Sequence, residues 1–146
     1  MVEAVIFDWV GTLYHFGGKG LFPFSERVLE TLKPRYKLAV ISKADHDKIE
    51  ERSRQIDEVK KYFEFIDVGA DKTLIQFIRC MESLKVPSKK TLVVDDRTVR
   101  GIRLGNMLGC QTAWIQRGTY SNEIPNEKTG EPTYRINSVE DLLTIL

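Results

Sequence analysis

The sequence predicts a doubly wound α/β domain of the Rossmann-like type, with about five parallel strands and helices on both faces of the sheet. Short apolar runs of four to six residues recur along the chain, and helical patterns separate them. Strands that are apolar throughout are typical of a parallel sheet covered by helices on both faces. The length of 146 residues suits one domain with a core of its own. We therefore expect a single domain over residues 1–146.

The expected elements alternate along the chain. A short flap at about 14–24 follows the first strand, and Ser25 is the expected cap of a helix that ends at Pro34. The polar loop at 116–132 is long for a compact domain, so it is either mobile or functional. The strands are expected at 3–8, 36–42, 66–69, 91–95 and 111–115, and the helices at 25–33, within 45–63, from 74 to before Pro87, at about 98–108 and at 139–146.

The composition excludes several classes of protein. A net charge of +1 gives no footprint for nucleic acid or an anionic membrane. No apolar run approaches the roughly 18 residues of a membrane span, and the N-terminus lacks the pattern of a signal peptide. Cys80 and Cys110 have no CxxC or Cys/His spacing, so we expect two packed thiols. We expect a cytoplasmic protein with no nucleic-acid or membrane partner.

Residues suited to phosphoryl chemistry follow the expected strands. Asp8 closes the first strand, Ser42 the second and the pair Asp95-Asp96 the fourth, while Lys72 follows the third. In an open parallel sheet, ligands bind outside the carboxyl ends of the strands, so these side chains should converge in one crevice. A carboxylate attacks phosphorus only when a cation and fixed donors relieve the charge repulsion. This set of residues supplies both.

These motifs, in this order, resemble those of the haloacid dehalogenase superfamily of hydrolases and phosphatases. Residues 5–13 (VIFDWVGTL) resemble its first motif, Ser42 matches the hydroxyl of the second and Lys72 the lysine of the third. Residues 93–97 (VVDDR) with 105–109 resemble the acidic fourth motif and its helix. The resemblance runs from residue 5 to about 118 and reaches weakly into the tail. A single Asp, Ser or Lys after a strand is more often a helix cap or a solvated residue, but four motifs in this order are specific.

The resemblance implies a nucleophile and a metal site. Asp8 would form an aspartyl-phosphate and would also be a ligand of Mg²⁺. Asp96, or with less support Asp95, would complete the coordination together with the backbone carbonyl of Val10. A hard cation with oxygen ligands suits such a site.

The resemblance also implies groups that bind the substrate. Ser42 would donate a hydrogen bond to a phosphoryl oxygen, and Lys72 would pair with the nucleophile and the phosphoryl group. Arg97 begins a stripe with Arg100 and Arg103 that we interpret as solvated, although Arg97 lies near the acids. The further candidates for substrate binding are Gly11, Thr12, Lys43 and Arg97.

The chain departs from the family's pattern at two positions. Phosphatases of the superfamily usually carry a second Asp two residues after the nucleophile, where this chain has Val10. General acid–base catalysis contributes about 10²–10⁴-fold, so the loss is large but leaves electrostatic catalysis intact. His15, on the flap, could replace that acid because histidine side chains are common acids and bases in catalysis, but we favour a hairpin-tip residue without a role. Gly101 stands where many relatives have an acid, and Asp95 could supply the missing carboxylate.

No cap domain fits into the chain. Only 33 residues separate Asp8 from Ser42, and helix and strand patterns occupy the interval from Ser42 to Lys72. A crevice covered only by the flap implies a large substrate or a partner that closes it.

The sequence therefore predicts a Mg²⁺-dependent hydrolase that acts on a phosphomonoester or an acyl phosphate, of a small molecule or a macromolecule. The alternative is a phosphate- or metal-binding domain with little turnover, used in regulation or assembly. Carbon–halogen hydrolysis is disfavoured, because the family members that perform it rely on a cap. A phosphorelay receiver domain uses similar groups, but its acid pair precedes its phosphoacceptor Asp, so the order here excludes it. The sequence identifies neither the substrate nor the oligomeric state.

Overall fold

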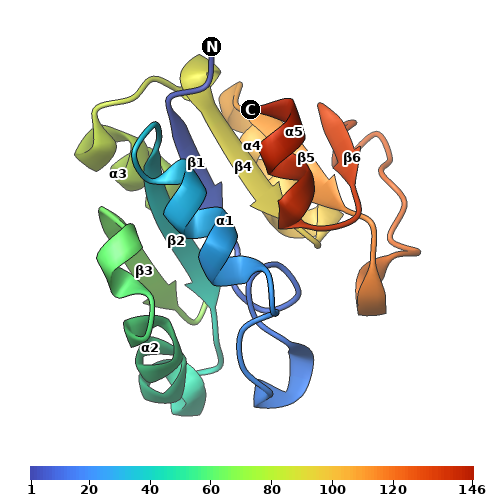
Figure 1. Ribbon diagram of the computed structural model, residues 1–146. Helices are drawn as coiled ribbons and strands as arrows, with labels where there is room; N and C mark the ends of the chain where they lie inside the picture. Colours follow the sequence, from blue (N-terminus) through green and yellow to red (C-terminus); the bar gives the residue numbers. More distant parts are fainter.

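The computed structural model describes residues 1–146, and it shows one parallel sheet with helices on both faces (Figure 1). The strands lie in the order β3-β2-β1-β4-β5-β6, and every neighbouring pair is parallel. The predicted α/β fold is confirmed, and there is no separate cap domain. The strands are β1 (Ala4–Phe7), β2 (Lys37–Lys43), β3 (Phe65–Gly69), β4 (Thr91–Asp95), β5 (Gln111–Ile115) and β6 (Tyr134–Ile136).

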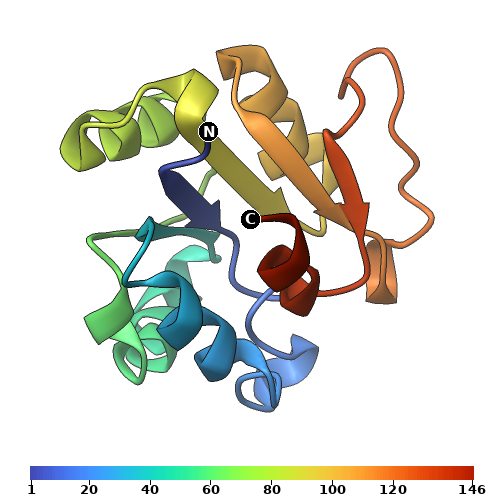
Figure 2. The ribbon, with the colours of Figure 1, turned by 45° about the horizontal axis from the view of Figure 1, so that its top comes forward.

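Five α-helices cover the sheet in two layers (Figures 1 and 2). α1 packs with α5 on one face, and α3 packs with α4 on the other. None of these helices is both long and apolar enough to cross a membrane. The helices are α1 (Ser25–Leu32), α2 (Ile49–Asp57), α3 (Leu74–Leu84), α4 (Arg103–Leu108) and α5 (Leu142–Ile145).

The side chains of β1 divide between two hydrophobic cores. Val5 and Phe7 belong to the core beneath α1 and α5, whereas Ala4 and Ile6 belong to the core beneath α3 and α4. Successive residues of a strand point to opposite faces, so a strand covered on both sides must be apolar at every position. This is why the run before Asp8 contains no polar residue.

Two expectations about local structure were wrong. β6 is a sixth strand, and its three residues pair with the edge of β5; so short a segment after a polar loop has no strand pattern of its own. Ser25 does not cap α1: Phe24 stands at the N-cap, and the Ser25 hydroxyl donates to the carbonyl of Leu13 at 2.7 Å. That hydrogen bond ties the start of the flap to α1.

The strand order places a crevice at the carboxyl ends of the central strands. The chain progresses outward in opposite directions from β1 and from β4, so the switch point of the topology lies between these two strands. The segment 14–24 lies at this end of the sheet (Figure 1). Bridges of Tyr14 to Val10 and to Leu21 hold that segment in place.

Candidate active site

Asp8, Lys72 and Asp95 form a buried ion-pair cluster at the carboxyl ends of the strands. Asp8 directly follows β1, and its amide donates to the carbonyl of Val94 at 3.0 Å, which fixes it beside β4. The ammonium of Lys72, beyond β3, lies 2.9 Å from Oδ1 of Asp8 and 3.2 Å from Oδ2 of Asp95. The Lys72 side chain is only 3% exposed, so water screens these charges little. Three residues that lie far apart in the sequence thus meet at one edge of the sheet, as the strand pattern predicts.

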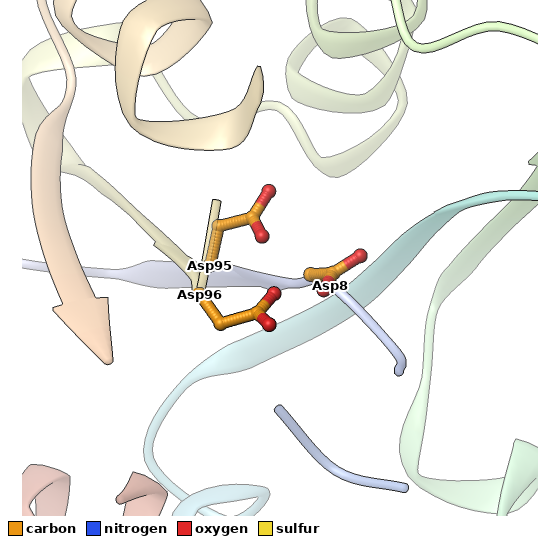
Figure 3. Close-up of side chains that lie close together, drawn as sticks. All are labelled: Asp8, Asp95 and Asp96. Atoms are coloured by element: carbon orange, nitrogen blue, oxygen red, sulfur yellow. The ribbon is translucent and has the colours of Figure 1, made fainter. Parts of the chain in front are cut away.

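The neighbouring carboxylates of Asp95 and Asp96 differ in their partners. Oδ1 of Asp95 accepts from the amide of Arg97 at 3.0 Å, and Oδ2 accepts from the amide of Gly101 at 2.9 Å and from Lys72. Both carboxylate oxygens of Asp96 are buried, and neither has a hydrogen-bond partner. In Figure 3 the Asp96 carboxylate is directed toward Asp8, whereas that of Asp95 points to the other side of the chain. A buried carboxylate without partners is costly, so the site calls for a ligand at Asp96.

The three carboxyl groups titrate differently because their surroundings differ. Burial, with the charges of Asp8 and Asp95, raises the pKa of Asp96 to about 10. Burial and the charge of Asp8 also raise the pKa of Asp95 to about 6, although Lys72 opposes this. Burial works against the charge of Asp8 as well, but the charge and hydrogen bond of Lys72 outweigh it and hold the pKa of Asp8 below its ordinary value. Without a further cation, the cluster therefore keeps Asp8 ionised and Asp96 protonated at neutral pH.

The ammonium of Lys72 stays charged in this cluster. Its burial favours the neutral amine, but Asp8 and Asp95 raise the pKa of Lys72 above its ordinary value. Lys72 is therefore a fixed positive charge beside Asp8 rather than a group that exchanges protons near neutral pH.

Two glycines make room for the acids. Gly11 has a φ of +85°, and a Cβ on it would clash with the carboxylate of Asp96. Both features require glycine at this turn. A Cβ on Gly101 would clash with the carboxylate of Asp95. The carboxylate of Asp95 therefore fills the space beside Gly101.

The three carboxylates are close enough to share a cation. One ligand oxygen from each of Asp8, Asp95 and Asp96 lies within 4.8 Å of the other two. Asp96 has both oxygens free for such a ligand, whereas those of Asp95 are engaged by the protein. The geometry therefore favours Asp96 over Asp95 as the partner of Asp8 in binding a metal.

Ser42 lies near the end of β2, on the side of Asp8 away from β4, and is 1% exposed. Its Oγ accepts a hydrogen bond from Nη1 of Arg52 at 2.6 Å, and the same nitrogen donates to the carbonyl of Lys43 at 2.8 Å. The Lys43 side chain makes no hydrogen bond or ion pair. Arg52 is not predicted from the sequence, because it stands in the charged helix α2 and no motif separates it from solvated neighbours such as Arg54.

A hollow of about 400 Å³ opens beside Arg52, between the segment 14–24 and α2. Val10 and Arg52 both line this hollow. The full lining consists of Val10, Tyr14, Gly17, Gly18, Lys48, Glu51, Arg52 and Gln55.

Of the other candidates on the first motif and its flap, Thr12 contacts Asp8 and His15 does not. The Thr12 hydroxyl donates to Oδ2 of Asp8 at 3.3 Å. The ring of His15 packs against Phe22, with 4.2 Å between ring centroids, and makes no hydrogen bond. His15 lines a second cavity, of about 310 Å³, between the flap and the end of β5. Its place in that cavity offers no proton donor to the hollow at Val10.

Arg97 is engaged by the loop 116–132. Its guanidinium forms an ion pair with Glu123 at 3.1 Å and stacks 3.8 Å above the ring of Tyr120. It makes no hydrogen bond or ion pair with the three aspartates. Glu123 also accepts from the hydroxyl of Thr98 and the amide of Val99. Arg97 therefore anchors the long loop to the segment that follows β4.

A parallel α/β domain with an acid after the first strand, a buried lysine and an acid pair after the fourth strand defines the haloacid dehalogenase class of proteins. The family model described as haloacid dehalogenase-like hydrolase matches residues 19–115. The match spans more than half of the chain, so the chain belongs to this family. No curated protein matches the chain.

Solved structures share the fold at low sequence identity. A HAD phosphatase from Thermococcus onnurineus has a TM-score of 0.78 at 14% identity, over 99% of this chain and 97% of that chain. A 2-haloacid dehalogenase from Pseudomonas syringae pv. Tomato has a TM-score of 0.80 at 14% identity, over 99% and 98%. YfnB from Bacillus subtilis, solved bound to magnesium, has a TM-score of 0.69 at 20% identity, over 88% of this chain and 57% of that chain. At these identities the likeness concerns the fold alone.

Proposed function

We propose that the protein is a Mg²⁺-dependent hydrolase without a cap domain, which transfers a phosphoryl group from a phosphomonoester or acyl phosphate to Asp8. The observation that carries the proposal is the buried ion pair of Asp8 and Lys72 beside the partnerless carboxylate of Asp96. Membership of a hydrolase family supports it, and so does the fold shared with the phosphatase from Thermococcus onnurineus.

Asp8 is suited to act as the nucleophile. Lys72 holds Oδ1 and the Thr12 hydroxyl holds Oδ2, so the carboxylate is oriented and ionised. An oxygen of Asp8 attacks phosphorus, the bond from phosphorus to the leaving oxygen breaks, and that oxygen keeps the electron pair. Water then attacks the phosphorus of the aspartyl-phosphate, which releases inorganic phosphate and the Asp8 carboxylate, and the proton of the water passes to solvent.

The residues at the site fit Mg²⁺. The donors are oxygens only, as a hard cation requires, and the Asp96 carboxylate is buried without a partner. Asp8, Asp96 and the carbonyl of Val10 would hold the ion, and the magnesium in the related fold of YfnB supports this choice. When bound, Mg²⁺ supplies positive charge that offsets the charge of the phosphoryl group and the carboxylates.

Val10 restricts the substrates that such an enzyme turns over. Its side chain can neither protonate a leaving oxygen nor deprotonate water, and His15 lies in a different cavity. Acyl phosphates and phenolic esters need little protonation of the leaving group, so we expect these to be the substrates that react.

Val10 also favours a second candidate function, a phosphate- and metal-binding domain with little turnover. In that case Asp8 would bind a phosphoryl analogue but release phosphate slowly or not at all. The absence of a cap domain argues against carbon–halogen hydrolysis.

A phosphatase screen with Mg²⁺ against acetyl phosphate, para-nitrophenyl phosphate and a sugar phosphate tests the proposal. We expect hydrolysis of the first two and little of the third. Fluorine NMR of a beryllium fluoride adduct on Asp8 separates the two candidates: an adduct without turnover identifies a binding domain. Absence of both the adduct and turnover would overturn Asp8 as the nucleophile.

A further inference from the structure

We infer that Arg52 is a phosphoryl-binding residue, which contacts a non-bridging oxygen of the substrate together with Ser42. The inference deepens the proposed function and rests on it. The inference rests on the position of the Arg52 guanidinium, which donates a hydrogen bond to Ser42 near Asp8. Arg52 also lines the hollow that Val10 lines.

The hydrogen bond between Arg52 and Ser42 leaves the serine proton available. Oγ of Ser42 accepts from Arg52 at 2.6 Å, and no protein group accepts from this hydroxyl. A hydroxyl has one proton to donate beside its two lone pairs. Because Arg52 occupies a lone pair, the proton is free to point to an anion in the crevice.

The guanidinium of Arg52 also has donors to spare. The side chain makes two hydrogen bonds, and Nη1 donates both of them, to Ser42 and to the carbonyl of Lys43. Nε is buried and has no partner. No carboxylate forms an ion pair with Arg52. A guanidinium presents five N–H donors in a planar fork that matches the oxygens of a phosphate. A partly buried guanidinium that forms no ion pair and lies next to Ser42 therefore suits an anionic ligand there.

Arg52 supplies charge that Lys72 does not. The Lys72 ammonium is shared between Asp8 and Asp95, so two carboxylates already offset its charge. The proposed Mg²⁺ site lies on the side of Asp96, so a phosphoryl dianion at Asp8 would also gain from a cation on the side of β2. In this cap-less chain, α2 delivers that cation from within the core domain.

Arg52→Gln and Arg52→Lys test the inference, with Arg54→Gln as the matched control. Arg54 lies on the same helix, with a side chain 70% exposed and 3.9 Å from Glu50. Calorimetric titration with inorganic phosphate in the presence of Mg²⁺ measures affinity without any need for turnover. Steady-state kinetics with acetyl phosphate and para-nitrophenyl phosphate add the effect on two leaving groups, and thermal unfolding reports the fold of each variant.

We expect Arg52→Gln to weaken phosphate binding by about 10- to 100-fold, as the loss of a charged hydrogen bond predicts. The value of kcat/KM should fall by a similar factor for both substrates, because a contact with a non-bridging oxygen does not depend on the leaving group. Arg52→Lys should lie between wild type and Arg52→Gln, and Arg54→Gln should match wild type. If Arg52→Gln does not fold, the same measurements on Arg52→Lys test the inference, with a smaller loss of affinity expected.

Two results would overturn the inference. The first is an unchanged affinity for phosphate in a folded Arg52→Gln protein. Arg52 would then serve only to connect α2 to β2 through its hydrogen bonds. The second is a loss of rate confined to one leaving group, which would place Arg52 at the leaving oxygen. Failure of the proposed function looks different: the wild-type protein would bind phosphate in an Arg52-dependent way but turn over neither substrate.

Discussion

The two walls of the crevice differ in charge, and each contains a buried group that the protein leaves unsatisfied. The acidic wall, formed by Asp95 and Asp96 at the end of β4, holds the partnerless carboxylate. The basic wall, formed by Ser42 at the end of β2 and Arg52 on α2, holds the partnerless Nε. Because β1 lies between β2 and β4, Asp8 stands between the walls. In our proposal one wall binds a cation and the other an anion, and Asp8 lies between them.

The largest expected effect comes from removing the carboxylate of Asp8. Asp8→Asn should abolish phosphoryl transfer, by about 10³-fold or more, since loss of a nucleophile removes the covalent step. Without Mg²⁺ the variant should unfold at a lower temperature than wild type near neutral pH, because the buried ammonium of Lys72 loses the charged partner 2.9 Å away. Rates with acetyl phosphate and thermal unfolding in a chelator check both statements. Full activity in the variant would contradict the proposed role of Asp8 as the nucleophile.

The second prediction concerns a variant with an acid in the hollow that Val10 and Arg52 line. Val10→Asp should raise turnover of a sugar phosphate by up to roughly 10²-fold, the low end of what general acid catalysis supplies. Para-nitrophenyl phosphate needs little protonation of its leaving group, so its rate should rise less. Comparing both substrates on both proteins decides the matter, and Val10→Asn controls for polarity without an ionisable group.

Equal acceleration of the two substrates by Val10→Asp would point to faster cleavage of the aspartyl-phosphate alone. An unchanged rate with both substrates would mean that the missing acid does not limit the enzyme, contrary to our proposal.

The third effect separates the two members of the acidic wall. Mg²⁺ at about 100 times its Kd should raise the unfolding temperature by roughly 5–10 °C, since it binds the native crevice and not the unfolded chain. The shift should vanish in Asp96→Ala. Asp95→Ala should lower the stability of the metal-free protein, because Lys72 and two backbone amides lose an acceptor, yet keep part of the shift. The reverse pattern would show that Asp95 is the ligand.

The acidic wall could largely be predicted from the sequence, whereas the basic wall could not. Asp8 and the acid pair end apolar strands, and the carboxyl ends of parallel strands meet, so their convergence follows from local patterns. The choice between Asp95 and Asp96 depends on which carboxylate turns toward the amide of Gly101, and this is a property of the folded backbone. Arg52 lies on the exposed helix α2, where a functional arginine and a solvated one have the same pattern.

Contacts distant in the sequence account for the other differences. β6 is recognisable only by its pairing with the edge of β5, and the fold is otherwise as the apolar runs predict. Arg97 follows the acid pair, which suggested a role at the substrate, but its guanidinium pairs with Glu123 in the long loop. No local pattern indicates that Glu123, rather than solvent or substrate, would be its partner.

The smallest expected effect is a change with pH that Asp96 alone produces in the metal-free protein. The raised pKa of Asp96, about 10, lies far above its ordinary value of 3.8. Between these values the folded state keeps a proton that the unfolded state loses, so the contribution of Asp96 to stability is present at low pH and is lost as the pH rises. Asp96→Asn lacks this titration. In a chelator, the unfolding temperature of the variant relative to wild type should therefore increase from pH 5 to pH 8, by a few degrees, because the nearby charges of Asp8 and Asp95 also change with pH and weaken the dependence. The pKa of Asp8 is lowered, which has the opposite effect: the stability that Asp8 contributes is lost as the pH falls below its ordinary value. The two proteins are therefore compared only above pH 5.

Asp57→Asn, at the exposed end of α2, controls for the loss of a carboxylate elsewhere. A gap between Asp96→Asn and wild type that stays constant with pH would mean that Asp96 is already ionised without metal, and that the acidic wall tolerates three negative charges around Lys72.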